Sequence, residues 1–189
     1  MTNSSGRHVE AFGLASVVEL INEWGEVPRA VADEADAPYP EVTAALQISA
    51  DDFRSRYGAP TTAALRTAAD ALYPLFGSDG PAMVEAIGRL LTSTALRPAL
   101  IARDADTVDE VWECTRAADR LVAGAVLSIV EHLRFDGDVT RLGVCSGDDC
   151  ADVYVDLSPA RRRRFCSVTC QNRNRARSYR RARAEHGDS

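Results

Sequence analysis

The chain has 189 residues, of which 46% are hydrophobic and 26% are charged, and its formal net charge is −6. This size fits one globular domain, or a medium domain with a small one, and the composition excludes a disordered chain. The longest apolar run, residues 121–127, is far shorter than the roughly 20 residues that span a bilayer. The polar first residues do not resemble a signal peptide, so we expect a cytoplasmic protein that does not enter a membrane.

Charge is divided unevenly along the chain. Residues 1–140 carry 11 Arg against 22 acidic residues, a formal charge of −11, whereas residues 141–183 carry 11 Arg against 4 Asp, a formal charge of +7. The chain contains 22 Arg and no Lys, so all of these positive charges are guanidinium groups, which are suited to phosphate. An acidic body joined to a basic segment indicates two separate roles.

The N-terminal part has the spacing of helices. Apolar residues predict a first helix within residues 9–24, and the prolines and acids of residues 28–40 predict a loop. Ser49 is expected to cap a short helix that ends at Gly58, and Thr61 a clearer one that ends at Gly77.

The following segment reads as two more helices with a break between them. Pro81 opens the first of these helices. Residues 97–103 have no helical period and contain a proline, which predicts a short strand or a loop. Thr107 is predicted to begin the longest helix, which continues to Leu133, and Gly124 within it indicates a close helix crossing or a bend.

Four cysteines form two close pairs, Cys145 with Cys150 and Cys166 with Cys170, separated by 15 residues. Each pair can place two thiolates on one metal ion, and Zn²⁺ takes four such ligands in a tetrahedron. Because disulfides are rare in the cytoplasm, we interpret the four as ligands of one structural Zn²⁺. The alternatives are two disulfides, or buried or reactive cysteines. So short a segment needs the ion, since it cannot bury enough apolar surface to fold alone.

The residues around the cysteines predict a treble-clef-like finger, a β-hairpin followed by a helix. Gly147 permits a tight turn between the first two ligands. Alternation over residues 153–157 predicts one strand, residues 163–165 the returning strand, and a helix with Cys170 in its first turn continues through Arg183. Cys114 is instead predicted to lie mid-helix as a small buried hydrophobe.

The predicted fold class is therefore mainly α, with an N-terminal helical domain and a small C-terminal zinc finger. The boundaries are residues 1–140 for the helical domain, 141–184 for the finger and 185–189 for a disordered tail. The turn between the two parts is short, so we expect the finger to pack on the last helix of the body.

Arginines gather on the finger. The candidate nucleic-acid contacts are Arg161, Arg162, Arg163, Arg164, Asn172, Arg173, Arg175, Arg177, Arg180, Arg181 and Arg183. Helical spacing puts Arg173, Arg177 and Arg180 on one face, where their charges repel unless an anion such as phosphate compensates. Tyr179 is the one aromatic residue of the basic helix, which favours duplex DNA over single strands. A solvated charge run, or an Arg face docked on the acidic domain, is the alternative.

Residues 145–183 resemble the CGNR zinc finger, found at the C-terminus of bacterial proteins whose helical N-terminal region is called the ABATE domain. The matching residues are Cys150, Val153 to Ser158, Arg163 to Arg173 and Tyr179 to Arg183. The motif that names the family reads Cys170-Gln171-Asn172-Arg173 here, and Phe165 and Val168 stand where Trp and Met are usual. The resemblance implies a stress-responsive transcriptional regulator.

The sequence lacks the common catalytic motifs, namely a nucleophile elbow, a phosphate-binding loop, a dinucleotide fingerprint and a His-Glu-x-x-His pair, so we do not expect an enzyme. We expect a zinc-dependent, DNA-binding transcriptional regulator whose helical domain senses a small-molecule effector or forms a homodimer. Two alternatives stay open. One is a protein-interaction module whose Arg helix binds an acidic partner, such as RNA polymerase or a second copy, and the other is an RNA-binding accessory protein.

Overall fold

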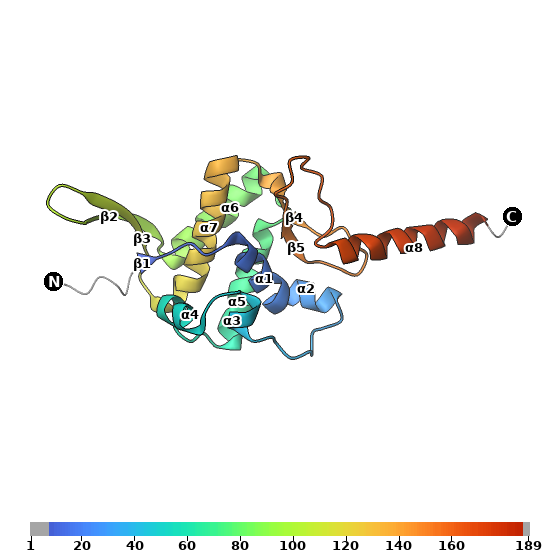
Figure 1. The fold of residues 1–189 in the computed structure, drawn as a ribbon, viewed down its shortest axis with the longest axis horizontal. Helices are drawn as coiled ribbons and strands as arrows, with labels where there is room; N and C mark the ends of the chain where they lie inside the picture. The colour runs from blue at the N-terminus through green and yellow to red at the C-terminus, as the bar shows by residue number, and fades with distance from the viewer. Residues whose placement is uncertain (1–7, 187–189) are drawn as a thin grey trace.

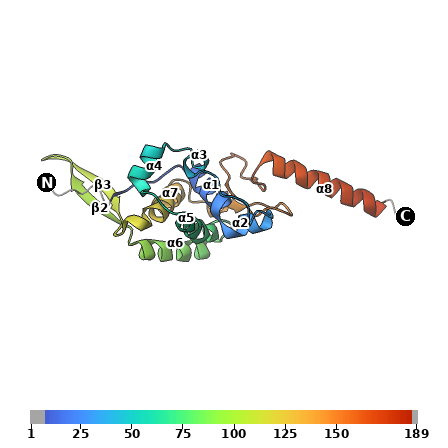
Figure 2. The ribbon, with the colours of Figure 1, turned by 90° about the horizontal axis from the view of Figure 1, so that it is seen from below.

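The computed structural model of the chain describes residues 8–186. A helical body stands in the middle, a β-hairpin arm projects from one end, and a long C-terminal helix projects from the other (Figures 1 and 2). The chain is mainly helical, with a small C-terminal β-hairpin next to four cysteines, which confirms the predicted fold class. Within the described residues, no helix is both long and apolar enough to cross a membrane.

Within residues 8–186, seven α-helices build the body around its main core. They are α1 (Leu14–Trp24), α2 (Glu26–Val31), α3 (Val42–Ala45), α4 (Ala50–Tyr57), α5 (Thr62–Leu72), α6 (Gly80–Thr94) and α7 (Arg120–Asp136). The apolar face of each longer helix points inward, so Trp24, Leu72, Met83 and Ile129 are at most 1% exposed. α1 packs against α5, and α6 packs against α7.

The predicted helix starts are confirmed by their capping hydrogen bonds. The Ser49 hydroxyl accepts from the Asp52 amide (3.1 Å), and the Thr61 hydroxyl accepts from the Ala64 amide (3.2 Å). In α6 the Asp79 carboxylate accepts from the Ala82 amide (2.9 Å), and Pro81 lies in the first turn, where its missing N–H costs no helical hydrogen bond.

Near the N-terminus the structure differs from the prediction at two points. The first helix begins only at Leu14, because β1 (His8–Val9) is drawn into a sheet instead. The predicted loop over residues 28–40 begins as helix α2, which contains Pro28 in its first turn. Arg29 then holds the following loop, because its buried guanidinium donates to the carbonyls of Glu34 (2.7 Å) and Ala37.

The prediction that the longest helix begins at Thr107 is wrong for residues 107–119, because α7 begins only at Arg120. β3 (Val108–Glu113) pairs antiparallel with β2 (Arg97–Ala102), with Ala99 opposite Val111, and with β1 on its other side. The Asp104 carboxylate accepts from the amides of residues 106 and 107, both at 2.9 Å, which turns the chain back as a hairpin. The strand expected within residues 97–103 is therefore confirmed, and Cys114 is buried as predicted but follows β3 instead of lying mid-helix.

Gly124 of α7 lies at a close approach of two segments, although not at the predicted helix crossing. A Cβ there would stand 2.9 Å from the Glu10 carbonyl and 3.2 Å from the Phe12 ring, so only glycine fits without a shift. The neighbour is the segment that leads into α1 rather than another helix. This contact, together with the Ser128 hydroxyl that donates to the Phe12 carbonyl (2.6 Å), holds the start of α1 on α7.

The C-terminal part contains β4 (Leu142–Val144), β5 (Val153–Val155) and α8 (Val168–His186). β4 pairs antiparallel with β5, with Gly143 opposite Tyr154. The predicted hairpin of residues 153–157 with 163–165 is wrong, because residues 163–165 are held by side chains rather than by a strand. The predicted disordered tail is helical at residues 185–186, and residues 187–189 lie outside the described part.

The C-terminal hairpin shares its core with the helical body. Leu142, Val153 and Val155 belong to the same buried cluster as the body helices. The Asn22 side chain on α1 pairs with the main chain of Val153, donating to its carbonyl (3.1 Å) and accepting from its amide (2.7 Å). The hairpin thus packs mainly on α1. Arg141 and Arg161 also form ion pairs with Asp136 at the C-terminal end of α7, the last helix of the body.

Candidate metal centre and basic helix

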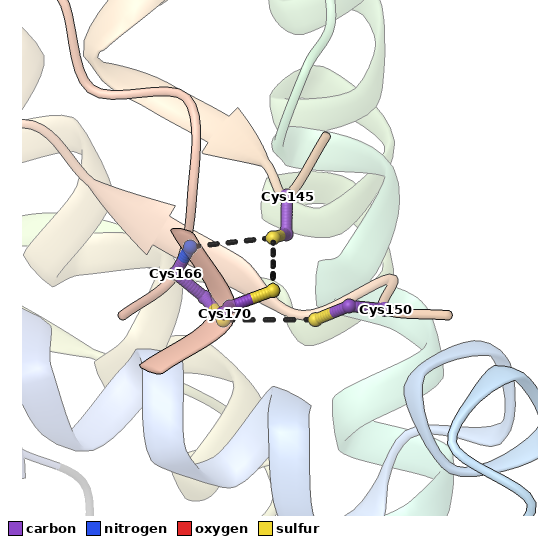
Figure 3. Close-up of side chains that lie close together, drawn as sticks. All are labelled: Cys145, Cys150, Cys166 and Cys170. Atoms are coloured by element: carbon purple, nitrogen blue, oxygen red, sulfur yellow. Dashed lines mark hydrogen bonds between the residues drawn. The ribbon is translucent and has the colours of Figure 1, made fainter. Parts of the chain in front are cut away.

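Two segments bring the four cysteines together. Cys145 follows β4 and Cys150 precedes β5, so residues 145–150 form a loop that we call the knuckle; Cys166 precedes α8, and Cys170 lies in its first turn. Their sulfur atoms all lie within 4.8 Å of one another (Figure 3). The Cys145–Cys170 and Cys150–Cys166 sulfur distances are 3.4 and 3.6 Å.

These distances fit one tetrahedral zinc ion. With Zn–S bonds of about 2.3 Å, neighbouring sulfurs of a tetrahedron stand about 3.8 Å apart. The five cysteines are free thiols, and the sulfurs are too far apart for disulfide bonds of about 2.05 Å. The four cysteines therefore form a single zinc site, as predicted. Four thiolates complete the coordination shell, which leaves no open position for a substrate.

Main-chain hydrogen bonds shape the site before any metal enters. The Cys145 amide donates to the Asp152 carbonyl (2.8 Å) and closes the knuckle, and the Ser146 amide donates to the Arg164 carbonyl (2.8 Å), which ties the knuckle to the second segment. A Cβ on Gly147 would stand 2.8 Å from the Cys170 sulfur, so the predicted turn requires glycine for space. At the start of α8 the Ser167 hydroxyl accepts from the Cys170 amide (3.1 Å).

The four thiols differ in their readiness to ionise. Burial works to raise the pKa of Cys145, but the amides of Cys166 and Gly147, which point at its sulfur, outweigh burial and lower it. Burial raises the pKa of Cys150 to about 12 and that of Cys170 to about 11, and it raises the pKa of Cys166 as well. Without metal, most of the site is protonated at neutral pH, so zinc binding releases protons.

One arginine of the 161–164 run is part of the finger's internal framework. The Arg163 guanidinium donates to the carbonyls of Phe165 (2.9 Å), Val155 (3.0 Å) and Cys166, and it lies over the Tyr154 ring, 5.1 Å from its centroid. The Tyr154 hydroxyl donates back to the Arg163 carbonyl (2.7 Å). Arg163 thus joins β5 to the segment that carries Cys166.

A buried carboxylate completes this framework. Asp156 is 3% exposed and accepts from the amides of Ser158 (2.9 Å) and Arg163 (2.8 Å). A hydrogen bond from the Ser158 side chain, and then the bonds from the two amides, lower the pKa of the Asp156 carboxyl, so it stays ionised. They also satisfy the residue 163 amide, which explains why residues 163–165 do not need a strand partner.

The other candidate arginines fall into two groups. Arg161 pairs with Asp136 (3.3 Å) and Asp138 (2.8 Å) at the end of α7. On α8, Arg177 pairs with Asp149, and Arg181 pairs with Asp148 at 2.8 Å. The remaining candidates are exposed, and no ion pair joins them to another side chain that the structure describes: Arg162, Arg164, Arg173, Arg175, Arg180 and Arg183, with the uncharged Asn172 exposed as well.

The sequence did not lead us to predict the structural roles of two residues at the site. Asn22 sits among apolar residues of α1 with nothing in the pattern to indicate a partner 131 positions away. Asp156 did carry a signal, because an acid directly after three buried strand residues is rare unless its oxygens are hydrogen-bonded.

A cleft of about 890 Å³ lies beside the interface of the body and the finger. α1 and α2 line one side, and the knuckle with residues 152–157 lines the other. Glu19 and Glu23 of α1 face Asp152 across it. Burial, then repulsion from Glu23 and Asp152, raises the pKa of Glu19.

Residues 141–183 match the family description "CGNR zinc finger". The matched segment begins at the residue before β4 and covers all four cysteines and α8 to Arg183. A search of curated proteins found no match to the chain.

Proposed function

Because residues 141–183 form a CGNR zinc finger, we propose that this chain is a zinc-dependent, DNA-binding regulator of transcription. In this proposal the ion has a structural role, and the chain is not an enzyme. One observation carries the proposal: α8 leaves the zinc site and projects from the molecule (Figures 1 and 2) with six Arg and no acidic residue between positions 173 and 183.

The projection of α8 also reduces repulsion between DNA and the acidic body. Residues 1–140 carry a formal charge of −11, which repels a polyanion. A helix of 19 residues is about 28 Å long, several times the Debye length of about 8 Å in physiological salt. The outer turns of α8 therefore offer guanidinium groups where the field of the body is largely screened.

The test is a salt-dependent binding titration. We expect the zinc-loaded full chain to bind a fluorescent DNA duplex, with log K falling linearly against log salt at a slope of about −3 to −4, for about four phosphate contacts. Chelated protein should lose this binding, because α8 is then no longer held. If zinc-loaded protein ignores duplex DNA at low salt, the proposal is wrong.

A second candidate is a protein-interaction module with an acidic partner. It is favoured by the ion pairs of Arg177 and Arg181, which show that α8 arginines engage carboxylates. Capture of RNA polymerase that survives nuclease treatment, without a shift of duplex DNA, would support it. Stronger binding to duplex RNA than to duplex DNA of the same sequence would instead support an RNA-binding accessory protein.

Regulation in this proposal lies with the helical body. The cleft between α1 and the finger is the candidate site for a small-molecule effector, and a homodimer would present two copies of α8 to paired half-sites. An effector in the cleft should change the DNA affinity of the wild type more than that of Ala15→Trp, whose larger side chain narrows the cleft. Sedimentation at rising protein concentration measures dimerisation, and a monomer bound one-to-one on DNA would contradict the dimer.

A further inference from the structure

The knuckle presents two carboxylates to one face of α8. Asp149 contacts Arg177 and Asp148 accepts from Arg181, and because these arginines are four positions apart they lie on successive turns of the same face. Asn174 and Arg177 are only half-exposed, in agreement with their position against the knuckle. This face fixes the direction of α8 from the zinc site.

A second set of α8 residues points the other way. At about 100° per residue, Asn172, Arg175, Tyr179 and Arg183 share a stripe that lies roughly 180° around the helix from Arg177 and Arg181. All four are exposed, and the Tyr179 side chain is 67% exposed although it is large and partly apolar. Among the side chains that the structure describes, no carboxylate pairs with Arg175.

We propose that this stripe is the surface of α8 that contacts duplex DNA, and that Arg177 and Arg181 are positioning residues that hold the helix against the knuckle. The inference rests on the proposed function and deepens it. Arg175 and Arg183 stand about 12 Å apart along the axis, similar to the roughly 12 Å width of the B-DNA major groove, so they can reach phosphates on its two sides.

The two other members of the stripe suit the same ligand. Tyr179 lies between the two arginines, where its ring packs on deoxyribose and its hydroxyl donates to a phosphate oxygen. Asn172, nearest the zinc site, offers an amide that can donate to and accept from a base edge or the backbone. This surface differs from the face of Arg173, Arg177 and Arg180 that helical spacing predicts, because the knuckle already occupies part of that face.

The experiment compares charge-matched variants of the zinc-loaded full chain on one DNA duplex. Arg175→Gln with Arg183→Gln removes two charges from the stripe, and Arg177→Gln with Arg181→Gln removes two from the knuckle face. We expect the first variant to bind at least about tenfold more weakly, with a salt slope smaller in magnitude by about 2. The DNA affinity of the second variant should fall by less than about threefold, because the arginines that it removes are already paired with Asp148 and Asp149.

Two further variants leave the charge unchanged, so they test the stripe even if the second variant loses the α8 helix. Tyr179→Ala should weaken binding by at least about threefold with an unchanged salt slope, whereas Ser178→Ala, its neighbour off the stripe, should bind as the wild type does. Two results would overturn the stripe assignment but not the proposed function. In the first, the wild type binds DNA and the stripe variants bind it equally well. In the second, the knuckle-face variant loses as much affinity as the stripe variant while keeping its helix content. If the wild type binds no duplex, the proposed function itself is wrong.

Discussion

Two neighbouring arginines show how differently the same residue type is used in the finger. Arg163 donates to three carbonyls and stacks on Tyr154, so its side chain is held in place although it is exposed. Arg162, the preceding residue, is exposed and has no hydrogen bond or ion pair in the described part of the chain. Both add the same charge to the finger, but only Arg163 supports the segment that brings Cys166 to the metal.

We therefore expect Arg163→Ala to lower the free energy of unfolding by about 1–3 kcal/mol, because it leaves carbonyls without donors. The zinc affinity of this variant should fall as well, and competition against a chromophoric chelator measures it. Arg162→Ala is the matched control, with the same charge change and an expected effect within about 0.5 kcal/mol. Equal destabilisation by the two substitutions would contradict the framework role of Arg163.

At the scale of elements, the sequence predicts those that carry their own signals. α4, α5 and α6 have caps and apolar faces of their own, and the zinc ligands follow from spacing and thiol chemistry alone. β3 does not, because Val108, Val111 and Trp112 also match the helical period and its partner strands come from elsewhere in the chain. The ion pairs of α8 are equally hidden, since the knuckle reaches that helix only once the finger has folded.

An interaction between elements, α1 with the finger, leads to a pH-dependent prediction. The pKa of Glu19 is raised above its ordinary 4.5 by burial first, and then by Glu23 and Asp152. The folded state therefore favours the protonated carboxyl, and that contribution to stability is lost as pH rises through the raised pKa. At pH 7 the charged Glu19 destabilises the fold.

Glu19→Gln should accordingly raise the melting temperature at pH 7 by about 1–2 °C, a small gain because the side chain is half-exposed and screened. The gain should be larger at pH 8 than at pH 5, as differential scanning fluorimetry of zinc-loaded protein can measure. Glu110→Gln, at an exposed position of β3, is the control and should change neither value. A gain that grows on acidification would have the wrong sign and contradict this account.

At the scale of the whole molecule, the finger and the body are joined through a common interior. Leu142 and Val153 are 1% and 0% exposed within the core of the body helices. The Gly77 amide donates to the Leu142 carbonyl (2.7 Å), and the Tyr73 hydroxyl donates to the Ala151 carbonyl (3.1 Å). Loss of the finger would therefore open the core of the body.

Removal of zinc should thus destabilise the entire chain. With chelator, or in Cys166→Ser, we expect one cooperative transition lowered by more than about 5 °C, because bound metal stabilises only the folded state. Fluorescence of Trp24, buried in the body, can follow it in a Trp112→Phe background. If Trp24 keeps its wild-type transition while zinc is lost, the two parts fold independently and the shared-core account fails.

Because α8 is attached to the rest of the molecule at the zinc site and the knuckle, a rotation at this end moves the far end of the helix most. Since α8 is about 28 Å long, a tilt of only about 10° at its base moves its far end by about 5 Å, more than the 3.4 Å or so between successive base pairs. The base of α8 adjoins the cleft that α1 lines. A small change of tilt at the zinc site would consequently be magnified at the outermost arginines, in proportion to their distance from the metal.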